Sequence, residues 1–171
     1  MILKCKLVLL GFFIAAVLPF VALELFAYQN SGQTKGVRQE KAPDFTLNDL
    51  QGRKFRLSGN KGKPVLLVFG ATWCPFCREE IPHLKDIYAA YGKKGLVLVG
   101  IDIQESRAKV SAFANNYKLP YGLLLDEKAE VAKNYGVQGI PMLVLIDREG
   151  RILCRQCSTV EPLLDQMFKR R

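Results

Sequence analysis

The segment "PVLLVFGATWCPFC", residues 64–77, constrains the fold of this chain more than any other. It starts with Pro64–Ala71, a continuous run rich in Val and Leu, which is typical of a β-strand covered on both faces. From Pro75 to about Tyr91, apolar side chains then recur on one stripe at helical spacing. A buried strand that turns directly into a helix predicts a sheet with helices packed on it, with Cys74 and Cys77 at the turn.

The rest of the chain repeats this alternation of strand and helix patterns. Two short alternating runs, residues 44–49 and 54–58, predict an N-terminal β-hairpin. Further strands are expected at residues 96–102, 121–126, 141–147 and 151–157, and helices after Ser106, from Asp126 to Gly136, and from Thr159 to Phe168. The predicted class is therefore α/β, with a central mixed, largely parallel sheet flanked by helices and closed by an antiparallel hairpin.

The first residues carry a separate hydrophobic segment. Apolar residues dominate from residue 7 to residue 27, which is about the ~20 residues that a membrane-spanning helix requires. No small-residue cleavage site follows, so an uncleaved signal anchor at residues 7–27 is favoured over a removed signal peptide or a buried core helix. Lys4 and Lys6 would keep the N-terminus in the cytoplasm.

This reading divides the chain into four parts. Residues 1–6 are expected to be a cytoplasmic N-terminus, 7–27 a transmembrane anchor, 28–41 a flexible polar tether and 42–171 a single folded domain. The folded domain would then lie outside the cytoplasm.

Charge and composition exclude several classes of function. The formal net charge is +9, but the basic residues are scattered and belong to no nucleic-acid-binding motif, so no nucleic-acid partner is predicted. A surface attracted to anionic lipid headgroups is the simpler interpretation. Five cysteines are too few for a disulfide scaffold, and a single histidine cannot build a zinc enzyme.

The position of the cysteine pair points to redox chemistry. Cys74 comes just before the expected helix, Pro75 fits the first helical position, and Cys77 follows one turn later. Unpaired N–H groups of the first helical turn favour a thiolate at Cys74, whereas Cys77 is expected to keep its proton and to resolve a mixed disulfide. A structural disulfide or half of a metal site remain as alternatives.

The motif WCPFC after an apolar strand, with Pro82 and with Gly139-Ile140-Pro141 before a later strand, resembles the thioredoxin superfamily. The segment "APDFTLNDLQGR", Glu80 in "CREEIP" and an extra helix–strand unit at about Ser106–Leu125 are similar to its membrane-anchored TlpA/ResA-like branch of thiol–disulfide oxidoreductases. The resemblance covers residues 42–171. It implies a thioredoxin-like fold in which the extra helix–strand unit lies between the CxxC motif and a cis-proline.

The resemblance also implies roles for individual residues. Cys74 matches the attacking cysteine and Cys77 the resolving one, together a redox-active disulfide, and Glu80 matches an acidic residue near them. Pro141 matches the cis-proline. The substrate-binding residues would be Trp73, Pro75, Phe76, Ile140 and Pro141. One departure is Val68, which stands where many thioredoxins bury an aspartate beneath the second cysteine.

A second pair, Cys154 and Cys157, lies on the last expected strand. Positions three apart on a strand face opposite sides, so the two are not preformed as a disulfide or chelating pair unless the strand ends between them. If the hairpin folds about Glu149, Cys157 lies opposite Pro141, and we hypothesise that it acts on Cys74 as an auxiliary thiol. Incidental apolar cysteines, or a four-cysteine metal site with the first pair, are the alternatives.

The sequence therefore predicts an enzyme that exchanges disulfides with protein substrates and needs no metal or cofactor. The resemblance implies a single-pass protein of the bacterial inner membrane with its catalytic domain on the periplasmic side. It also implies a membrane electron donor or acceptor as partner, and it favours a reductant serving cytochrome c maturation, whereas the residues alone leave the direction open. The alternative is a copper- or zinc-handling protein of the same fold. A peroxidase is disfavoured because Leu67 and Ala71 replace the residues of its motif.

Overall fold

The computed structural model describes residues 40–169, which belong to one compact unit, Gln39–Arg171. The predicted cytoplasmic N-terminus, membrane anchor and most of the tether lie outside the described residues. Within the described part of the chain, no helix is both long enough and apolar enough to cross a membrane.

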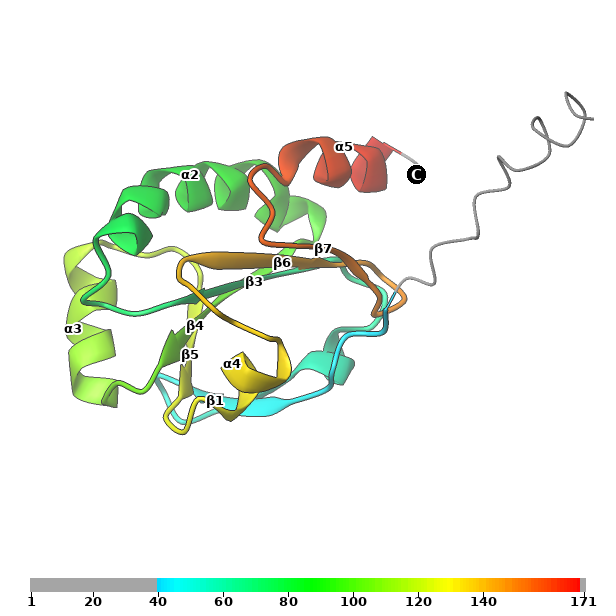
Figure 1. Cartoon of the computed structure of the whole chain (residues 1–171). Helices are drawn as coiled ribbons and strands as arrows, with labels where there is room; N and C mark the ends of the chain where they lie inside the picture. Colours follow the sequence, from blue (N-terminus) through cyan, green and yellow to red (C-terminus); the bar gives the residue numbers. More distant parts are fainter. Residues whose placement is uncertain (1–39, 170–171) are drawn as a thin grey trace, which may run out of the picture. The chain divides into compact units, whose positions relative to one another are not determined.

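Seven strands form one mixed sheet in the order β2-β1-β5-β4-β3-β6-β7 (Figure 1). Their bounds are β1 Thr46–Asp49, β2 Lys54–Arg56, β3 Val65–Gly70, β4 Val97–Ile103, β5 Gly122–Asp126, β6 Met142–Ile146 and β7 Ile152–Arg155. The three central strands β3, β4 and β5 run parallel to one another, and every other pairing is antiparallel. The N-terminal hairpin and the closing hairpin are therefore both confirmed.

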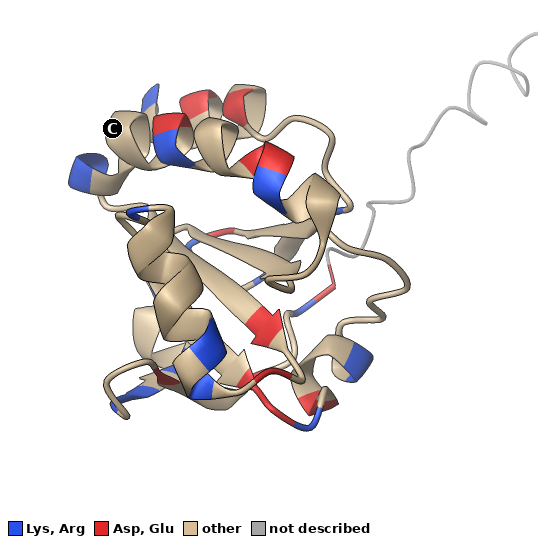
Figure 2. Cartoon of the chain, turned by 90° about the vertical axis from the view of Figure 1, so that its left-hand side faces the viewer, with Lys and Arg blue, Asp and Glu red and all other residues tan. Residues whose placement is uncertain are grey.

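Helices cover both faces of this sheet (Figure 1). They are α2 Pro75–Tyr91, α3 Arg107–Asn116, α4 Glu130–Asn134 and α5 Glu161–Lys169, with short 3-10 turns η1 Leu57–Asn60 and η2 Gly92–Lys94. Helices α2 and α5 share one hydrophobic cluster with the sheet, whereas α4 belongs to the cluster on the other side. Residues of both charges lie on α2 and α5, whereas α3 carries basic residues and no acidic ones (Figure 2).

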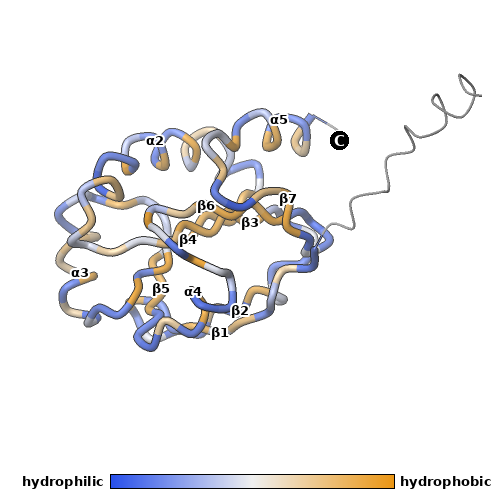
Figure 3. The backbone as a smooth tube through the Cα atoms, in the orientation of Figure 1, coloured by the Kyte–Doolittle hydropathy of each residue, from blue (hydrophilic) through white to orange (hydrophobic). Residues whose placement is uncertain are grey.

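Strand β3 lies at the centre of the core, as its unbroken apolar sequence predicts (Figure 3). Leu66 and Val68 pack on the α2 side, while Leu67 and Phe69 pack on the α4 side. Leu66, Leu67 and Phe69 have no exposed surface. Full burial of such a side chain contributes roughly 1.5–3 kcal/mol, so β3 is a rigid base for the helix that follows it.

The helix after Asp126 differs from its prediction. It begins at Glu130 rather than directly after Asp126, and it contains only five residues. Strand β5 continues to Asp126 itself, so the chain needs a turn through Ala129, which has a left-handed φ of 57°, before it can become helical. The Asp126 carboxylate still caps the helix, because it accepts hydrogen bonds from the backbone N–H groups of Val131 and Ala132.

Candidate active site

Cys74 occupies the N-cap of α2, immediately before Pro75. Its Sγ accepts a hydrogen bond from the backbone N–H of Cys77, with 3.3 Å between N and Sγ. Only 3% of Cys74 is exposed. An N–H group of the first helical turn that points at this sulfur stabilises a negative charge on it, as the sequence predicted from the strand-to-helix turn.

The segment just before β6 lies on the other side of Cys74 from the start of α2. The peptide bond between Ile140 and Pro141 is cis, which confirms the prediction for Pro141. The Cys74 thiol donates to the carbonyl oxygen of Ile140, with 3.6 Å between Sγ and O. Residues 66 positions apart in the sequence therefore meet at the reactive sulfur, because β6 pairs antiparallel with β3.

Cys77 lies one helical turn further on, half-buried against β3. A β-carbon added to Gly70 would lie 3.3 Å from Cys77 Sγ, a tight contact, so the glycine at the end of β3 gives this thiol more room than a residue with a side chain would. Burial first, and then the neighbouring Cys74, raise the pKa of Cys77 to about 12. Cys77 is thus held as a neutral thiol, as expected for a resolving cysteine.

The predicted substrate-binding residues form an exposed rim around Cys74. Trp73 and Phe76 are the exposed large hydrophobic residues of the described chain, at 62% and 67% exposure. Pro75 is also exposed, and Ile140 and Pro141 are partly exposed. An apolar rim around a buried sulfur is suited to an extended polypeptide, since its backbone can pair with the Ile140 segment while its side chains cover the aromatic rings.

Glu80 lies in the second turn of α2, but its nearest partner is a histidine. Nδ1 of His83 lies 2.5 Å from the Glu80 carboxylate, and Nε2 of His83 lies 2.6 Å from the Glu161 carboxylate of α5. Hydrogen bonding to Glu161, and secondarily to Glu80, raises the pKa of His83. His83 is therefore a partly buried residue that bridges two carboxylates, and a catalytic role for Glu80 stays a prediction.

Two acidic residues that the sequence reasoning missed lie beside the cysteines. Glu105 accepts hydrogen bonds from the backbone N–H and the hydroxyl group of Thr72, two residues before Cys74. Asp102, at the C-terminal end of β4, is 7% exposed, and its Oδ1 has no hydrogen-bond partner among the described residues. The signal available in the sequence is an acidic residue, Asp102, inside an otherwise apolar strand, with Glu105 close behind it; the register places Asp102 beside Gly70 of β3.

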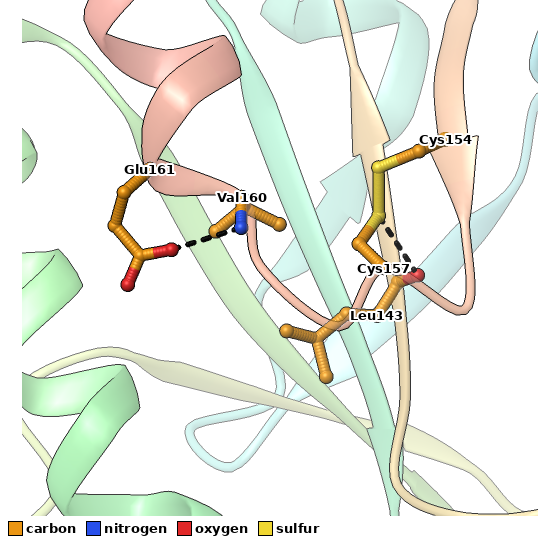
Figure 4. Close-up of a disulfide and its surroundings, with 5 residues drawn as sticks. All are labelled: Leu143, Cys154, Cys157, Val160 and Glu161. Carbon is orange, nitrogen blue, oxygen red and sulfur yellow. Dashed lines mark hydrogen bonds between the residues drawn. A yellow bond between two sulfur atoms is a disulfide. The ribbon is translucent and has the colours of Figure 1, made fainter.

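The second cysteine pair forms a disulfide between Cys154 and Cys157 (Figure 4). The strand does end between the two cysteines, the one case in which the sequence allowed them to bond. Strand β7 stops at Arg155, and Gln156 adopts a left-handed φ of 51°, which turns the two side chains toward each other. In this structure they are therefore a bonded pair that packs on the hydrophobic cluster beside α2 and α5, and an auxiliary role of the pair toward Cys74 stays a prediction.

The predicted position of Cys157 opposite Pro141 is also wrong. A register shift between Leu145 and Ile146 displaces β7, and the backbone N–H and the Sγ of Cys157 both lie against the carbonyl oxygen of Leu143 instead. Because a bulge is set by local backbone geometry, counting residues from the turn could not locate it. Among the described residues, no three His, Cys, Asp or Glu side chains are placed to hold a metal ion.

Comparison with known proteins agrees with this geometry. The AhpC/TSA family model matches residues 39–155. The thiol-disulfide oxidoreductase ResA of Bacillus thuringiensis subsp. konkukian is 36% identical over 114 residues, which cover 67% of this chain and 66%, just under two thirds, of the relative. ResA of Halalkalibacterium halodurans is 31% identical over 135 residues, covering 78% of this chain and 77% of the relative.

Solved structures show the same fold. The thioredoxin domain of a thiol-disulfide oxidoreductase from Bacteroides vulgatus has a TM-score of 0.68 and 28% identity, covering 77% of this chain and 95% of that one. A thiol-disulfide oxidoreductase from Bacteroides fragilis has a TM-score of 0.69 and 26% identity, covering 74% and 98%. The chain belongs to the AhpC/TSA family and, within it, to the thioredoxin-like thiol–disulfide oxidoreductases of the ResA type.

Proposed function

We propose that this protein is a membrane-tethered thiol–disulfide oxidoreductase that reduces disulfides in protein substrates outside the cytoplasm. The observation that carries the proposal is the arrangement at Cys74, whose sulfur accepts the N–H of Cys77 and also contacts the Ile140 carbonyl beside the cis-proline. This arrangement presents one activated sulfur, a second thiol within reach and an exposed rim for a polypeptide.

The reaction proceeds in two exchanges. The Cys74 thiolate attacks a substrate disulfide, which forms a mixed disulfide and releases one substrate sulfur as a thiolate that takes a proton. Cys77 then loses its proton and attacks Cys74 Sγ, which releases the second substrate thiol and leaves a Cys74–Cys77 disulfide. The substrate gains two electrons and two protons, and the enzyme dithiol loses them. A membrane electron donor would restore the dithiol.

The direction of disulfide exchange, the location of the protein and its biological role are proposed from the N-terminal sequence and from the family resemblance. The apolar segment at residues 7–27 supports a membrane anchor with the folded domain on the periplasmic side of the bacterial inner membrane. The resemblance to the ResA-like branch supports a reductant that serves cytochrome c maturation, and the relatives that carry the name ResA are thiol-disulfide oxidoreductases.

Trapping the mixed disulfide tests this proposal. The reduced full-length chain in detergent is mixed with a disulfide-bonded model peptide, and peptide reduction and protein mass are followed. Cys77→Ser is expected to accumulate the peptide bound to Cys74, because the second exchange has no thiol, and Cys74→Ser is expected to show neither binding nor reduction. The equilibrium with glutathione then assigns the direction.

The matched control removes the other cysteine pair. A Cys154→Ser/Cys157→Ser double variant is expected to reduce the peptide at the wild-type rate, because this pair contacts Leu143 rather than the reactive sulfur. Equal trapping on Cys74→Ser would show that Cys74 is not the attacking residue. A slow double variant would restore an auxiliary role for Cys154 and Cys157.

A further inference from the structure

A small cavity lies against Cys77, and none of the rim residues Trp73, Phe76 and Pro141 lines it. Its volume is about 50 Å³, large enough for a water molecule. The residues that line it are mostly apolar and include Val68 of β3. The polar groups among them are the thiol of Cys77, the hydroxyl group of Tyr121 and the side chain of Asp102, which is the one carboxyl group among the lining residues.

The sheet register brings Asp102 toward this thiol. Gly70 of β3 pairs directly with Asp102 of β4, and paired strands lie about 4.8 Å apart. The missing side chain of Gly70 would point at Cys77 Sγ, 3.3 Å from its β-carbon. Side chains of paired residues emerge on the same face of a sheet, so the Asp102 carboxyl group and the Cys77 thiol share that face.

Asp102 is poised to exchange a proton. More than nine-tenths of the residue is buried, and Oδ1 has no hydrogen-bond partner in the described part of the chain. Burial, and then the charge of Glu105, raise the pKa of Asp102 to about 8. The charge of Asp102 in turn contributes to the raised pKa of Cys77, after burial and Cys74.

The other charged and titratable groups near Asp102 have different tasks. Glu105 is paired with Lys109 and hydrogen-bonded by Thr72, and although burial opposes it, these bonds lower the pKa of Glu105. Tyr121 lines the cavity, and burial raises the pKa of its hydroxyl group, so it stays neutral. Of the two adjacent carboxyl groups, Glu105 is thus held ionised while Asp102 can change its protonation near neutral pH.

We propose that Asp102 is the acid–base group of Cys77. In the second exchange, the ionised Asp102 carboxylate takes the Cys77 proton, directly or through a water in the cavity, as the Cys77 sulfur attacks Cys74. The proton then passes from Asp102 to water. When the Cys74–Cys77 disulfide is reduced again, Asp102 returns a proton to the Cys77 sulfur. The inference rests on the proposed function. It assigns proton exchange with Cys77 to Asp102 rather than to Glu80, whose carboxylate is bound to His83.

Rapid mixing of the reduced full-length chain with an excess of the model peptide tests this assignment, because acid quenching and mass analysis separate the two exchanges. In the wild type, the rate of the second exchange is expected to rise with pH through about 8. Asp102→Asn is expected to slow that exchange roughly 100-fold at neutral pH, the scale of general base catalysis. The variant should also lose the rise near pH 8, while the first exchange, at Cys74, keeps its wild-type rate.

The matched control is Asp126→Asn, another buried aspartate at the end of the neighbouring parallel strand, which caps α4 and does not line the cavity. It is expected to keep both the rate and the pH profile. Glu105→Gln supplies an independent readout, since removing its charge should move the rise of the second exchange to lower pH.

The outcomes separate two failures. A second exchange with wild-type rate and pH profile in Asp102→Asn overturns the role of Asp102 alone. An unmoved pH profile in Glu105→Gln also contradicts it, and this test remains if Asp102→Asn does not fold. A wild-type chain that forms no mixed disulfide at all overturns the proposed function, and the role of Asp102 with it.

Discussion

At the scale of single residues, Asp102 destabilises the fold in which it sits. A buried carboxylate with an unpaired oxygen loses its hydration and regains little in exchange. The pKa of Asp102 is raised from 3.8 to about 8, so the folded protein binds this proton more tightly than the unfolded chain. Stability therefore falls as pH rises from about 4 to about 8 and changes no further above that range.

This cost gives a stability prediction. Asp102→Asn removes the ionisable group, so the variant should gain stability over the wild type as pH rises through this window. One pKa unit corresponds to about 1.4 kcal/mol, and the gain between about pH 5 and pH 8 should be on the order of 2 kcal/mol after local relaxation. Urea unfolding of both proteins across this range measures it. A difference that does not depend on pH would show that Asp102 is not buried as an acid.

At the scale of elements, His83 connects α2 to α5 in addition to the hydrophobic cluster that the two helices share. The imidazole bridges Glu80 of its own helix and Glu161 at the start of α5. Because the pKa of His83 is raised in the folded protein, the stabilisation is complete below the unfolded value of 6.5 and is lost as pH rises through the folded value.

The contribution of the His83 bridge to the free energy of unfolding should therefore change with pH. His83→Gln is expected to be less stable than the wild type near pH 6, by roughly 0.5 kcal/mol because the group is partly exposed, and the difference should shrink at higher pH. Urea unfolding at several pH values measures this change. A difference that grows with pH would contradict the charged bridge.

The Cys154–Cys157 disulfide closes the turn between β7 and α5. A loop of this length is expected to contribute about 2 kcal/mol by restricting the unfolded chain. The Cys154→Ser/Cys157→Ser variant should lose this amount in denaturant unfolding, and hydrogen exchange should become faster in α5. Unchanged stability would mean that the pair is reduced in the folded protein.

At the scale of the whole molecule, elements with strong local signals were predictable from the sequence. The apolar run of β3, the helix that begins at Pro75 and the two hairpins appear where the pattern places them. The placement of Cys74 and Cys77 at the start of a helix followed from motif and spacing, and the cis bond at Pro141 followed from the family resemblance. Asp102 did not, because its role depends on which strands lie side by side, and sequence spacing carries no such information. The predicted register of Cys157 failed for a related reason, a register shift that leaves one extra residue, Leu153, in β7.

The division of the chain into an anchor and a compact unit can be tested directly. A fragment that starts at residue 39 is expected to fold and to keep thiol exchange, because the compact unit Gln39–Arg171 contains the complete site. The fragment should remain in the supernatant when centrifuged with uncharged phosphatidylcholine vesicles, to which its basic surface is not attracted, whereas the full-length chain should sediment with them. A full-length chain that stays in solution would remove the basis for a membrane anchor.

The two edge strands of the sheet limit pairing between copies of this protein. Strand β2 has three residues and exposes Lys54 and Arg56, and the first residues of β7 are already paired with the backbone at Glu40 and Lys41. A second copy of the protein therefore has little free backbone to pair with at the sheet edges. The edge at β2 is short and positively charged, and the start of the edge at β7 is already hydrogen-bonded. Copies of the protein held at high local concentration on a membrane can thus avoid edge-to-edge strand pairing, the contact through which fibrils grow.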